Sequence, residues 1–459
     1  MKKALFIFIS ISFCLISCKK EIDNTITENK TVNQWIYNNM DTVYYWNSQL
    51  PLKPDFTLTP DKFFKSILSK EDRFSFIIDN VADLINMLND VEETFGYEYS
   101  LYLMPNSKNL VGQITYVEKN SPAQLAGIQR GDFFIAIDNT TITTDNYTNL
   151  LSINNSSITL TTAYYSTYGT FEKLKDISLT PVVLDEDPVI LDTIYQISNN
   201  KIGYLLYKQF VPDPGDSSLR YDKELESVFG NFKQAGVNFL ILDLRMNPGG
   251  ALSSARKLAS LIVKGLDTSK IFLENSYNPL MTSIFSYYYG SSFFNVKFIE
   301  EPNNIGNNLY YFVVITSRNT ASASEDLING LKPYMPVYLI GDTTVGKNYG
   351  SITVYDETKK INYGLQPLVL KVSNCLGQSD FSNGFIPNVL LKDVGLTLRQ
   401  FGDISETLLA AAINSITNNT AKSLTVQKEI SGKYFSEVYN SLSRKAKIPN
   451  AFIDIKKRK

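Results

Sequence analysis

The stretch LYYFVVITSRNTASASEDLINGL, residues 309–331, joins an apolar run, a loop rich in hydroxyl groups and an apolar helical stripe. Leu309 to Ile315 predicts a buried strand, and Leu327, Ile328 and Leu331 recur after it at helical spacing. The loop between them, residues 316–326, contains five hydroxyl side chains. A buried strand followed by an amphipathic helix is the repeating unit of α/β folds.

Strands and helices alternate in the same way on both sides of this stretch. Phe239 to Leu244 and Val337 to Ile340 are further apolar runs of strand length, and helical stripes flank the first of them. We therefore predict an α/β core over residues 184–418 with a largely parallel sheet. The hydrophobic fraction of 44% and the charged fraction of 20% are ordinary for a globular protein.

The chain begins with MKKALFIFISISFCLISC, residues 1–18, in which two lysines precede an apolar run and a cysteine. This order predicts a secretory signal whose apolar run is short for a stable spanning helix. Leu-Ile-Ser before Cys18 resembles the bacterial lipoprotein box, which implies removal of residues 1–17 and lipidation of Cys18. The alternative is an uncleaved anchor, or an ordinary signal with a chance cysteine. Both predict export, and the lipoprotein reading implies a bacterial membrane, with the protein facing the periplasm or the cell surface.

Three further segments lie outside the predicted core. Residues 18–30 are polar and lack a period, which predicts a flexible tether. Residues 31–90 contain apolar residues at helical spacing and predict a small N-terminal helical domain. Residues 419–459 form a C-terminal extension with a basic end. Cys375 is the one thiol left in the mature chain, and we expect it to be buried and inert.

Residues 91–183 have short alternating runs that are broken by turn residues. The motif SPAQLAGIQRGDFFIAID, residues 121–138, resembles a PDZ domain in its glycine, alanine and aspartate positions. The resemblance implies that an extended chain terminus is captured at a sheet edge. The loop at Phe95, Gly96 and Tyr97 would supply the amides for its carboxylate. Glu98 departs from the glycine-rich pattern and would repel that carboxylate if it pointed inward.

The chain contains no histidine, which restricts its possible chemistry. This absence excludes a Ser-His-Asp or Cys-His device and any zinc site that needs imidazole. A serine nucleophile would need another base, and a desolvated neutral lysine is the known substitute. No metal or organic cofactor is implied. Removal of residues 1–17 takes away Lys2 and Lys3 and leaves 42 basic against 46 acidic side chains, a formal charge of −4, which gives no reason to expect a nucleic-acid partner.

Three segments of the core could together supply a serine, a lysine and an oxyanion site. TASASE places Ser322 at a strand-to-helix junction, where a developing negative charge is favoured. VGKNYG places Lys347 after the third predicted strand. DLRMNPGG, residues 243–250, is a strand-to-helix turn whose unhindered amides could bind an oxyanion.

These segments resemble those of the C-terminal processing, or tail-specific, peptidases. In that family an SAS motif supplies the serine and a GK segment 25 positions later supplies the lysine, and Lys347 follows Ser322 by that spacing. The resemblance implies an oxyanion hole from the amide of Gly249 or Gly250 and that of Ala323. It also implies a core with the ClpP/crotonase-like fold, with the PDZ-like domain inserted in it or preceding it.

The sequence departs from the family at the group that orients the lysine. Some members have a glutamine four positions after the lysine, where this chain has Ser351, and others have an aspartate where it has Pro333. Ser351 could act only as a weaker orienter.

Each motif also has a structural alternative. Ser322 to Glu325 fits a helix capping box, as does Asp403 to Glu406. Lys347 alone fits a solvated loop lysine, and Asn247 to Gly250 alone fits a simple turn.

Together these features predict an exported, lipid-anchored serine endopeptidase that uses a Ser322/Lys347 dyad and an acyl-enzyme. Its expected partners are proteins or peptides, above all unfolded C-terminal tails bound by the PDZ-like domain. One alternative is a catalytically degenerate, peptide-binding lipoprotein on the same fold. A weaker alternative, a surface polymer-binding protein, would use the 28 tyrosines and 27 phenylalanines, whose spacing mostly indicates core positions.

Overall fold

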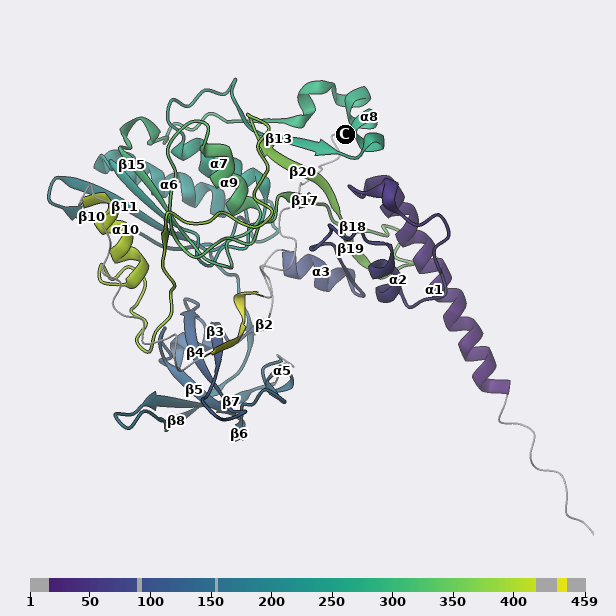
Figure 1. The fold of residues 1–459 in the computed structure, drawn as a ribbon, viewed down its shortest axis with the longest axis horizontal. Helices are drawn as coiled ribbons and strands as arrows, with labels where there is room; N and C mark the ends of the chain where they lie inside the picture. Colours follow the sequence, from purple (N-terminus) through teal and green to yellow (C-terminus); the bar gives the residue numbers. More distant parts are fainter. Residues whose placement is uncertain (1–15, 89–92, 153–155, 418–435, 444–459) are drawn as a thin grey trace, which may run out of the picture.

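The computed structural model describes residues 16–88, 93–152, 156–417 and 436–443 of the 459-residue chain (Figure 1). Its centre is a six-stranded sheet. Five of its strands are parallel to one another, and the sixth, β10, pairs antiparallel at one edge. In sheet order the strands are β10 (Val189–Ile197), β11 (Asn200–Tyr207), β12 (Phe239–Asp243), β15 (Tyr311–Thr316), β16 (Tyr338–Gly341) and β21 (Val389–Leu390). The predicted α/β core with a largely parallel sheet is confirmed.

Helices cover both faces of this sheet, which explains why its strands are continuous apolar runs. On one face Leu240 and Leu242 pack into the core cluster that contains side chains of three helices, α6 (Arg220–Ala235), α7 (Leu252–Ile262) and α9 (Ala323–Leu331). On the other face Ile241 and Ile315 pack against α10 (Thr407–Thr417). Because β12, β15 and β16 are adjacent and parallel, the loops that follow them meet at one edge of the sheet.

A second, four-stranded sheet lies beside the core. Its order is β14 (Asn295–Lys297), β13 (Ile271–Tyr277), β20 (Leu368–Asn374) and β17 (Tyr349–Ser351). The helix α8 (Pro279–Tyr289) and the short 3-10 helices η2 (Ser291–Phe294) and η3 (Gly306–Asn308) belong to the same region of the chain. Cys375, expected to be buried, follows β20 and is a half-buried free thiol.

The N-terminal unit is helical, with α1 (Ile16–Val43), η1 (Asn47–Gln49), α2 (Pro60–Ile67) and α3 (Val81–Leu88). Its strand β1 (Phe76–Ile78) pairs with β19 (Gly364–Gln366), which pairs with β18 (Val354–Tyr355). This three-stranded sheet attaches the N-terminal unit to residues 354–366 of the core. The tether predicted over residues 18–30 is wrong in this structure, because α1 runs through it. No proline or glycine interrupts residues 16–43, and adding turns to an existing helix is far easier than nucleating one.

The PDZ-like domain precedes the core and is a β-sheet with two short helices. Its sheet order is β22 (Ser436–Asn440), β3 (Tyr97–Leu103), β4 (Leu110–Val117), β5 (Phe133–Ile137), β7 (Ile158–Tyr165) and β8 (Phe171–Leu179), with β6 (Thr140–Thr141) also on β5. Its helices are α4 (Pro122–Leu125) and α5 (Tyr147–Leu150). At the two ends of the domain in sequence, β2 (Glu93–Thr94) and β9 (Val182–Val183) pair antiparallel. The strand β22 comes from the C-terminal extension, which the sequence did not predict.

Within the described ranges, no helix combines the length and the apolar character needed to cross a bilayer.

Candidate active site

Ser322 lies immediately before α9, buried, in a backbone conformation that is rare for a residue with a side chain. Its φ is 56° and its ψ is −119°. Such strain costs on the order of 1–3 kcal/mol and persists only where the surroundings hold it. Ser322 and Glu325 have the predicted capping-box arrangement: the Glu325 carboxylate accepts the Ser322 N–H at 2.9 Å, and the Ser322 side chain faces the Glu325 N–H. The contact of the Ser322 side chain is not a hydrogen bond, and the Ser322 Oγ has no hydrogen-bond partner among the described residues.

Glu325 joins the start of α9 to the loop that contains Lys347. One carboxylate oxygen accepts the N–H groups of Ser322 at 2.9 Å and Lys347 at 2.8 Å. The other accepts the Gly346 N–H at 2.7 Å and the Thr344 hydroxyl at 2.6 Å. Burial raises the pKa of Glu325, although these four hydrogen bonds act in the opposite direction. A single buried carboxylate therefore fixes the serine and the lysine relative to each other.

The Lys347 side chain is almost fully buried, with 1% of its surface exposed. Its Nζ has no hydrogen-bond partner in the part of the chain that the structure describes. Burial lowers the pKa of Lys347 to about 7, and the charges of Asp326, Glu325 and Asp72 act weakly in the opposite direction. A large share of this lysine is consequently a neutral amine near neutral pH, unlike the solvated loop lysine of the structural alternative.

Asp326, one turn after Ser322, is a further buried carboxyl group, which the sequence reading missed. Its Oδ1 has no hydrogen-bond partner within the described residues. Burial and the nearby Glu325 raise the pKa of Asp326 well above its usual range, while Lys347 lowers it. Asp326 and Lys347 are thus both shifted toward their neutral forms.

A turn of the N-terminal unit, residues 69–75, covers Lys347. The Arg73 guanidinium donates to the carbonyl oxygens of Gly346 at 2.7 Å and Ser382 at 2.8 Å. The Phe74 ring centroid lies 5.7 Å from the Lys347 Nζ. Asp72, held by the Tyr44 hydroxyl at 2.8 Å, is the third acidic group near the amine. The N-terminal unit therefore contributes to the water-excluding environment of this lysine.

The turn Asn247 to Gly250 packs directly against Ser322. A Cβ at Gly249, whose φ is 108°, would lie 2.8 Å from the Ser322 Cβ and 3.0 Å from the Ala323 nitrogen. The Asn247 carbonyl accepts the Ala321 N–H and the Ser324 hydroxyl, each at 3.2 Å. Only glycine fits such an approach in this conformation.

The amides expected to form an oxyanion hole differ in their availability. The Gly249 N–H is already bound by the Asn247 Oδ1 at 2.8 Å. The Gly250 and Ala323 N–H groups, by contrast, donate to no acceptor among residues the structure describes. Gly250 is fixed by its neighbours, because a Cβ there would lie 2.1 Å from the Phe210 carbonyl oxygen.

Ser351, the expected orienter of the lysine, lies buried on β17. Its Oγ accepts a hydrogen bond from the Gln366 amide at 3.0 Å, and the Gln366 carbonyl accepts the Thr353 hydroxyl at 3.0 Å. Ser351 is thus part of a buried polar chain that also contains Gln366, which the sequence reading did not single out.

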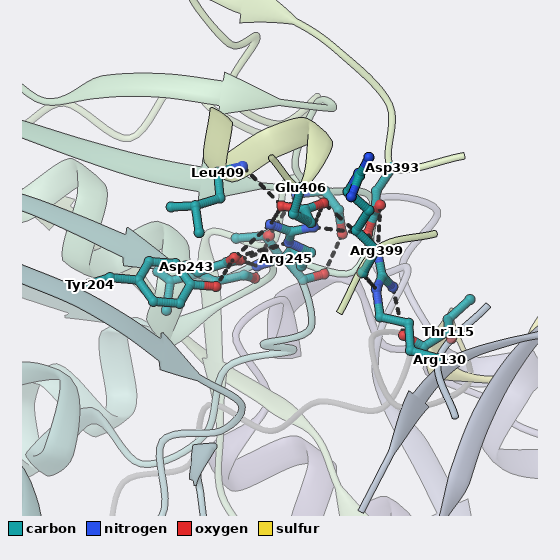
Figure 2. Close-up of polar contacts among 12 residues, drawn as sticks. Thr115, Arg130, Tyr204, Asp243, Arg245, Asp393, Arg399, Glu406 and Leu409 are labelled. Carbon is teal, nitrogen blue, oxygen red and sulfur yellow. Dashed lines mark hydrogen bonds and ion pairs between the residues drawn. The ribbon is translucent and has the colours of Figure 1, made fainter. Parts of the chain in front are cut away.

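Arg245, two positions before the Asn247–Gly250 turn, belongs to a buried ion network, which Figure 2 shows. The Arg245 guanidinium binds Asp243 at 2.7 Å, Glu406 at 2.8 and 2.9 Å, and Asp393 at 2.9 Å. Glu406, predicted as part of a capping box with Asp403, instead binds Arg245 and accepts the Leu409 N–H at 2.9 Å. The predicted box is wrong, because α10 begins at Thr407 and Glu406, not Asp403, therefore lies at the position that caps the helix.

The same network reaches the PDZ-like domain through Arg130. Its guanidinium binds both oxygens of Asp393, at 2.6 and 2.8 Å. Burial would raise the pKa of Asp393, but the Arg130 and Arg245 charges outweigh burial and lower it to about 2. The acidic group therefore stays ionised and links the PDZ-like domain to the turn beside Ser322.

Two other predicted site segments lie away from Ser322. Phe95 and Gly96 form a buried turn in which the Gly96 N–H donates to the Thr94 hydroxyl at 2.9 Å, and Tyr97 begins β3. Cys18 lies in the first turns of α1. Across the described ranges, no cluster of three or more cysteine, aspartate or glutamate residues could hold a metal ion.

Comparison with known proteins identifies three segments of this chain. The model described as "Peptidase family S41" matches residues 201–369, "Peptidase S41 N-terminal domain" matches residues 31–76, and "PDZ domain" matches residues 113–163. The chain is also similar to a solved structure, a putative S41 protease from Bacteroides fragilis. The TM-score is 0.71 and the identity 27%, over 84% of this chain and 97% of that one.

Two curated relatives have similar sequence identities to this chain. A carboxyl-terminal-processing protease of Picosynechococcus sp. is 26% identical over 306 residues, which are 66% of this chain and 66% of the relative. The carboxy-terminal processing protease CtpA of Bacillus subtilis is 25% identical over 244 residues, 51% of this chain and 45% of the relative. The chain thus spans about half to two thirds of the length of these relatives.

Proposed function

This chain carries the peptidase domain of family S41 together with that family's N-terminal domain and a PDZ domain, and from this premise we propose that it is a serine endopeptidase with a Ser322/Lys347 dyad. One observation carries the proposal. The Glu325 carboxylate binds the backbone N–H groups of Ser322 and Lys347 together, while the Ser322 Oγ and the Lys347 Nζ have no partner among the described residues. Burial of a hydroxyl and an amine without hydrogen-bond partners lowers the stability of the fold. Groups of this kind are concentrated at functional sites.

In the proposed reaction the neutral Lys347 amine removes the Ser322 hydroxyl proton, and the oxygen attacks a peptide carbonyl carbon. The lysine ammonium then gives this proton to the leaving amine, and an acyl-enzyme remains. Water hydrolyses the ester with the lysine again acting as base.

The oxyanion of each tetrahedral intermediate would be held by the Gly250 and Ala323 N–H groups. Gly249 would act through shape, because its own N–H is bound to Asn247.

Two groups compensate for the missing orienting glutamine in this proposal. Glu325 fixes the backbone of Lys347, and the turn 69–75 closes over its amine, with Phe74 excluding water and Arg73 holding the Gly346 carbonyl. Exclusion of water is what keeps the amine able to act as a base near neutral pH.

The test of the proposed function is incubation of the mature chain with unfolded proteins. Cleavage to defined fragments supports the peptidase. A second candidate, a degenerate protein that binds peptides without cutting them, is favoured by Ser351 and Pro333, which replace the family's orienting residues. Binding of the same proteins without any fragment would establish that candidate and reject the first.

We propose further that the protein is an exported lipoprotein attached to a bacterial membrane through Cys18, and that its PDZ-like domain binds segments of the protein substrate. The order of charged, apolar and small residues in residues 1–18 supports the anchor. Lipid on the first residue of the mature chain would sit at the end of α1, away from the active site.

Cys18→Ala is expected to lose the lipid, because the thiol that carries it is absent, so the protein either enters the soluble fraction or stays at the membrane as the uncleaved precursor. Cell fractionation followed by mass measurement of the N-terminal peptide checks this. Cys14→Ala, inside the predicted signal, should not change the amount of protein in the membrane fraction. A parent protein whose N-terminal peptide lacks the mass of a lipid on Cys18 would refute lipid anchoring at this position.

A further inference from the structure

The strand β22 occupies the edge of the PDZ-like sheet (Figure 1). It runs antiparallel to β3, with Ser436 opposite Leu103 and Asn440 opposite Ser100. Without β22, β3 would be the edge strand of this sheet. Addition of an extended segment to a free sheet edge is how PDZ domains bind peptides. A segment from more than 300 positions later in the same chain thus lies where a peptide ligand would bind.

The side chain of Tyr439 contacts aromatic rings on both β3 and α5. Its ring centroid lies 6.0 Å from that of Tyr99 on β3 and 5.7 Å from that of Tyr147 on α5. Asn440 adds a hydrogen bond from its amide to the Ser100 hydroxyl at 3.0 Å. The strand β22 is thus held by side-chain contacts as well as by backbone pairing. This combination is expected of a specific peptide ligand, whereas a strand that only shields the sheet edge needs backbone pairing alone.

Ser441 lies beside Glu98, which directly follows the loop that was expected to bind a terminal carboxylate. Its N–H donates to the Tyr99 carbonyl at 2.9 Å, and its Oγ accepts the Tyr99 N–H at 2.8 Å. The same hydroxyl donates to the Glu98 carboxylate at 2.5 Å. Glu98 would repel a carboxylate, but it accepts a hydroxyl proton well. The end of the groove is therefore suited to a serine inside a chain, not to a chain terminus.

We propose that the groove between β3 and α5 is a binding site for an extended internal peptide segment that has an aromatic residue and, two positions later, a serine, and that residues 436–442 of this chain are its resident ligand. A substrate segment enters only when β22 leaves. Because the resident ligand is tethered, it competes at an effective concentration on the order of millimolar, and weak external ligands are excluded.

Two features fit a ligand that can be displaced. Ser436, Glu437 and Val438 have exposed side chains and contribute little burial. The register also slips between Glu437 and Tyr439, which interrupts the backbone pairing. The attachment is therefore concentrated at Tyr439 and Ser441, followed by Leu442, which is buried in the core cluster beside α10.

Peptide binding to the full chain tests this site. All proteins carry Ser322→Ala, so that the probe is not cut and the result does not depend on peptidase activity. The probe is a fluorescent peptide with the sequence SEVYNSL, residues 436–442, blocked at both ends. Ser441→Pro removes the N–H and the hydroxyl that bind Tyr99 and Glu98, and we expect it to bind the probe at least about tenfold more tightly than the parent.

Two further variants serve as comparison. Val438→Ala, at the exposed side chain of the interrupted position, should bind the probe as weakly as the parent. Tyr439→Ala loosens β22 without a proline and should give an increase in the same direction as Ser441→Pro. In the probe itself, replacement of the tyrosine or of the second serine by alanine should weaken binding about tenfold.

The outcomes are distinct. If neither Ser441→Pro nor Tyr439→Ala binds the probe better than the parent, with circular dichroism unchanged, β22 is a permanent strand and the proposal is wrong. A peptide that ends in a free carboxylate after the asparagine should bind more weakly than the blocked probe, and Glu98→Gln should reverse this order. Equal or tighter binding of that peptide to the chain with Glu98 would overturn the assigned ligand class. The inference rests on the proposed function only for the view that the PDZ-like domain binds peptides, and loss of cleavage alone would not affect these binding results.

Discussion

Lys347→Ala and Ser322→Ala are each expected to lower kcat/KM for cleavage of an unfolded protein by about 10⁴-fold or more. The first change removes the base, and the second removes the nucleophile. Because the two groups act as one unit, the double variant should be no worse than either single variant by more than a few-fold. Cleavage rates from the appearance of fragments, with circular dichroism to establish folding, provide the measurement.

Matched variants separate this loss from general damage. Lys332→Ala removes an exposed lysine at the end of the same helix, α9, and should retain activity within a few-fold. Ser324→Ala removes a buried hydroxyl two positions from Ser322, with the loss of one hydrogen bond to the Asn247 carbonyl. If Ser324→Ala lost activity and Ser322→Ala kept it, the nucleophile would be reassigned.

Glu325→Gln is expected to lower kcat by about 10²-fold with a much smaller change in KM. The carboxylate accepts hydrogen bonds from three backbone N–H groups and one hydroxyl. The glutamine amide would turn a donor toward some of these donors, and the Ser322 and Lys347 segments would separate. A misplacement of about 1 Å is enough for a loss of this size.

The control for Glu325→Gln is a buried carboxylate elsewhere. Glu301 binds Lys257 of α7 at 3.0 Å and shares no hydrogen-bond partner with Glu325, so Glu301→Gln should lower stability but leave kcat within a few-fold. Steady-state kinetics with thermal unfolding of both variants distinguishes the two effects. A Glu325→Gln protein with the kcat of the parent would show that Glu325 does not position the dyad.

The regular part of the fold was predictable because local patterns determine it. The run Phe239 to Leu244 corresponds to β12, Phe239–Asp243, and the run Leu309 to Ile315 to β15, Tyr311–Thr316. Both strands are buried on two faces and therefore read as continuous apolar segments. The three motifs at Asn247, Ser322 and Lys347 follow three adjacent parallel strands, so their joint occurrence in the sequence predicts one common site.

The remaining features depend on contacts between distant segments, which no local pattern reports. Arg73 and Phe74 lie about 270 positions before Lys347, and nothing in their own sequence indicates that they cover it. Glu325 was predicted only as a helix cap, because its bonds to Gly346 and Lys347 come from another loop. The pairing of β22 with β3 also joins distant segments. A strand of only five residues is too short for its sequence to indicate which strand it pairs with.

The most direct test of the central claim is the pH dependence of Ser322 acylation by a serine-reactive fluorophosphonate, located by mass spectrometry. Lys347 must be neutral to remove the serine proton, and burial lowers its pKa from 10.5 to about 7. The labelling rate should therefore rise about tenfold per pH unit up to pH ~7 and level off above it. Labelling should be confined to Ser322 and be lost in Lys347→Ala. A rate that is constant from about pH 6 to 9, or a label on another serine, would contradict the account.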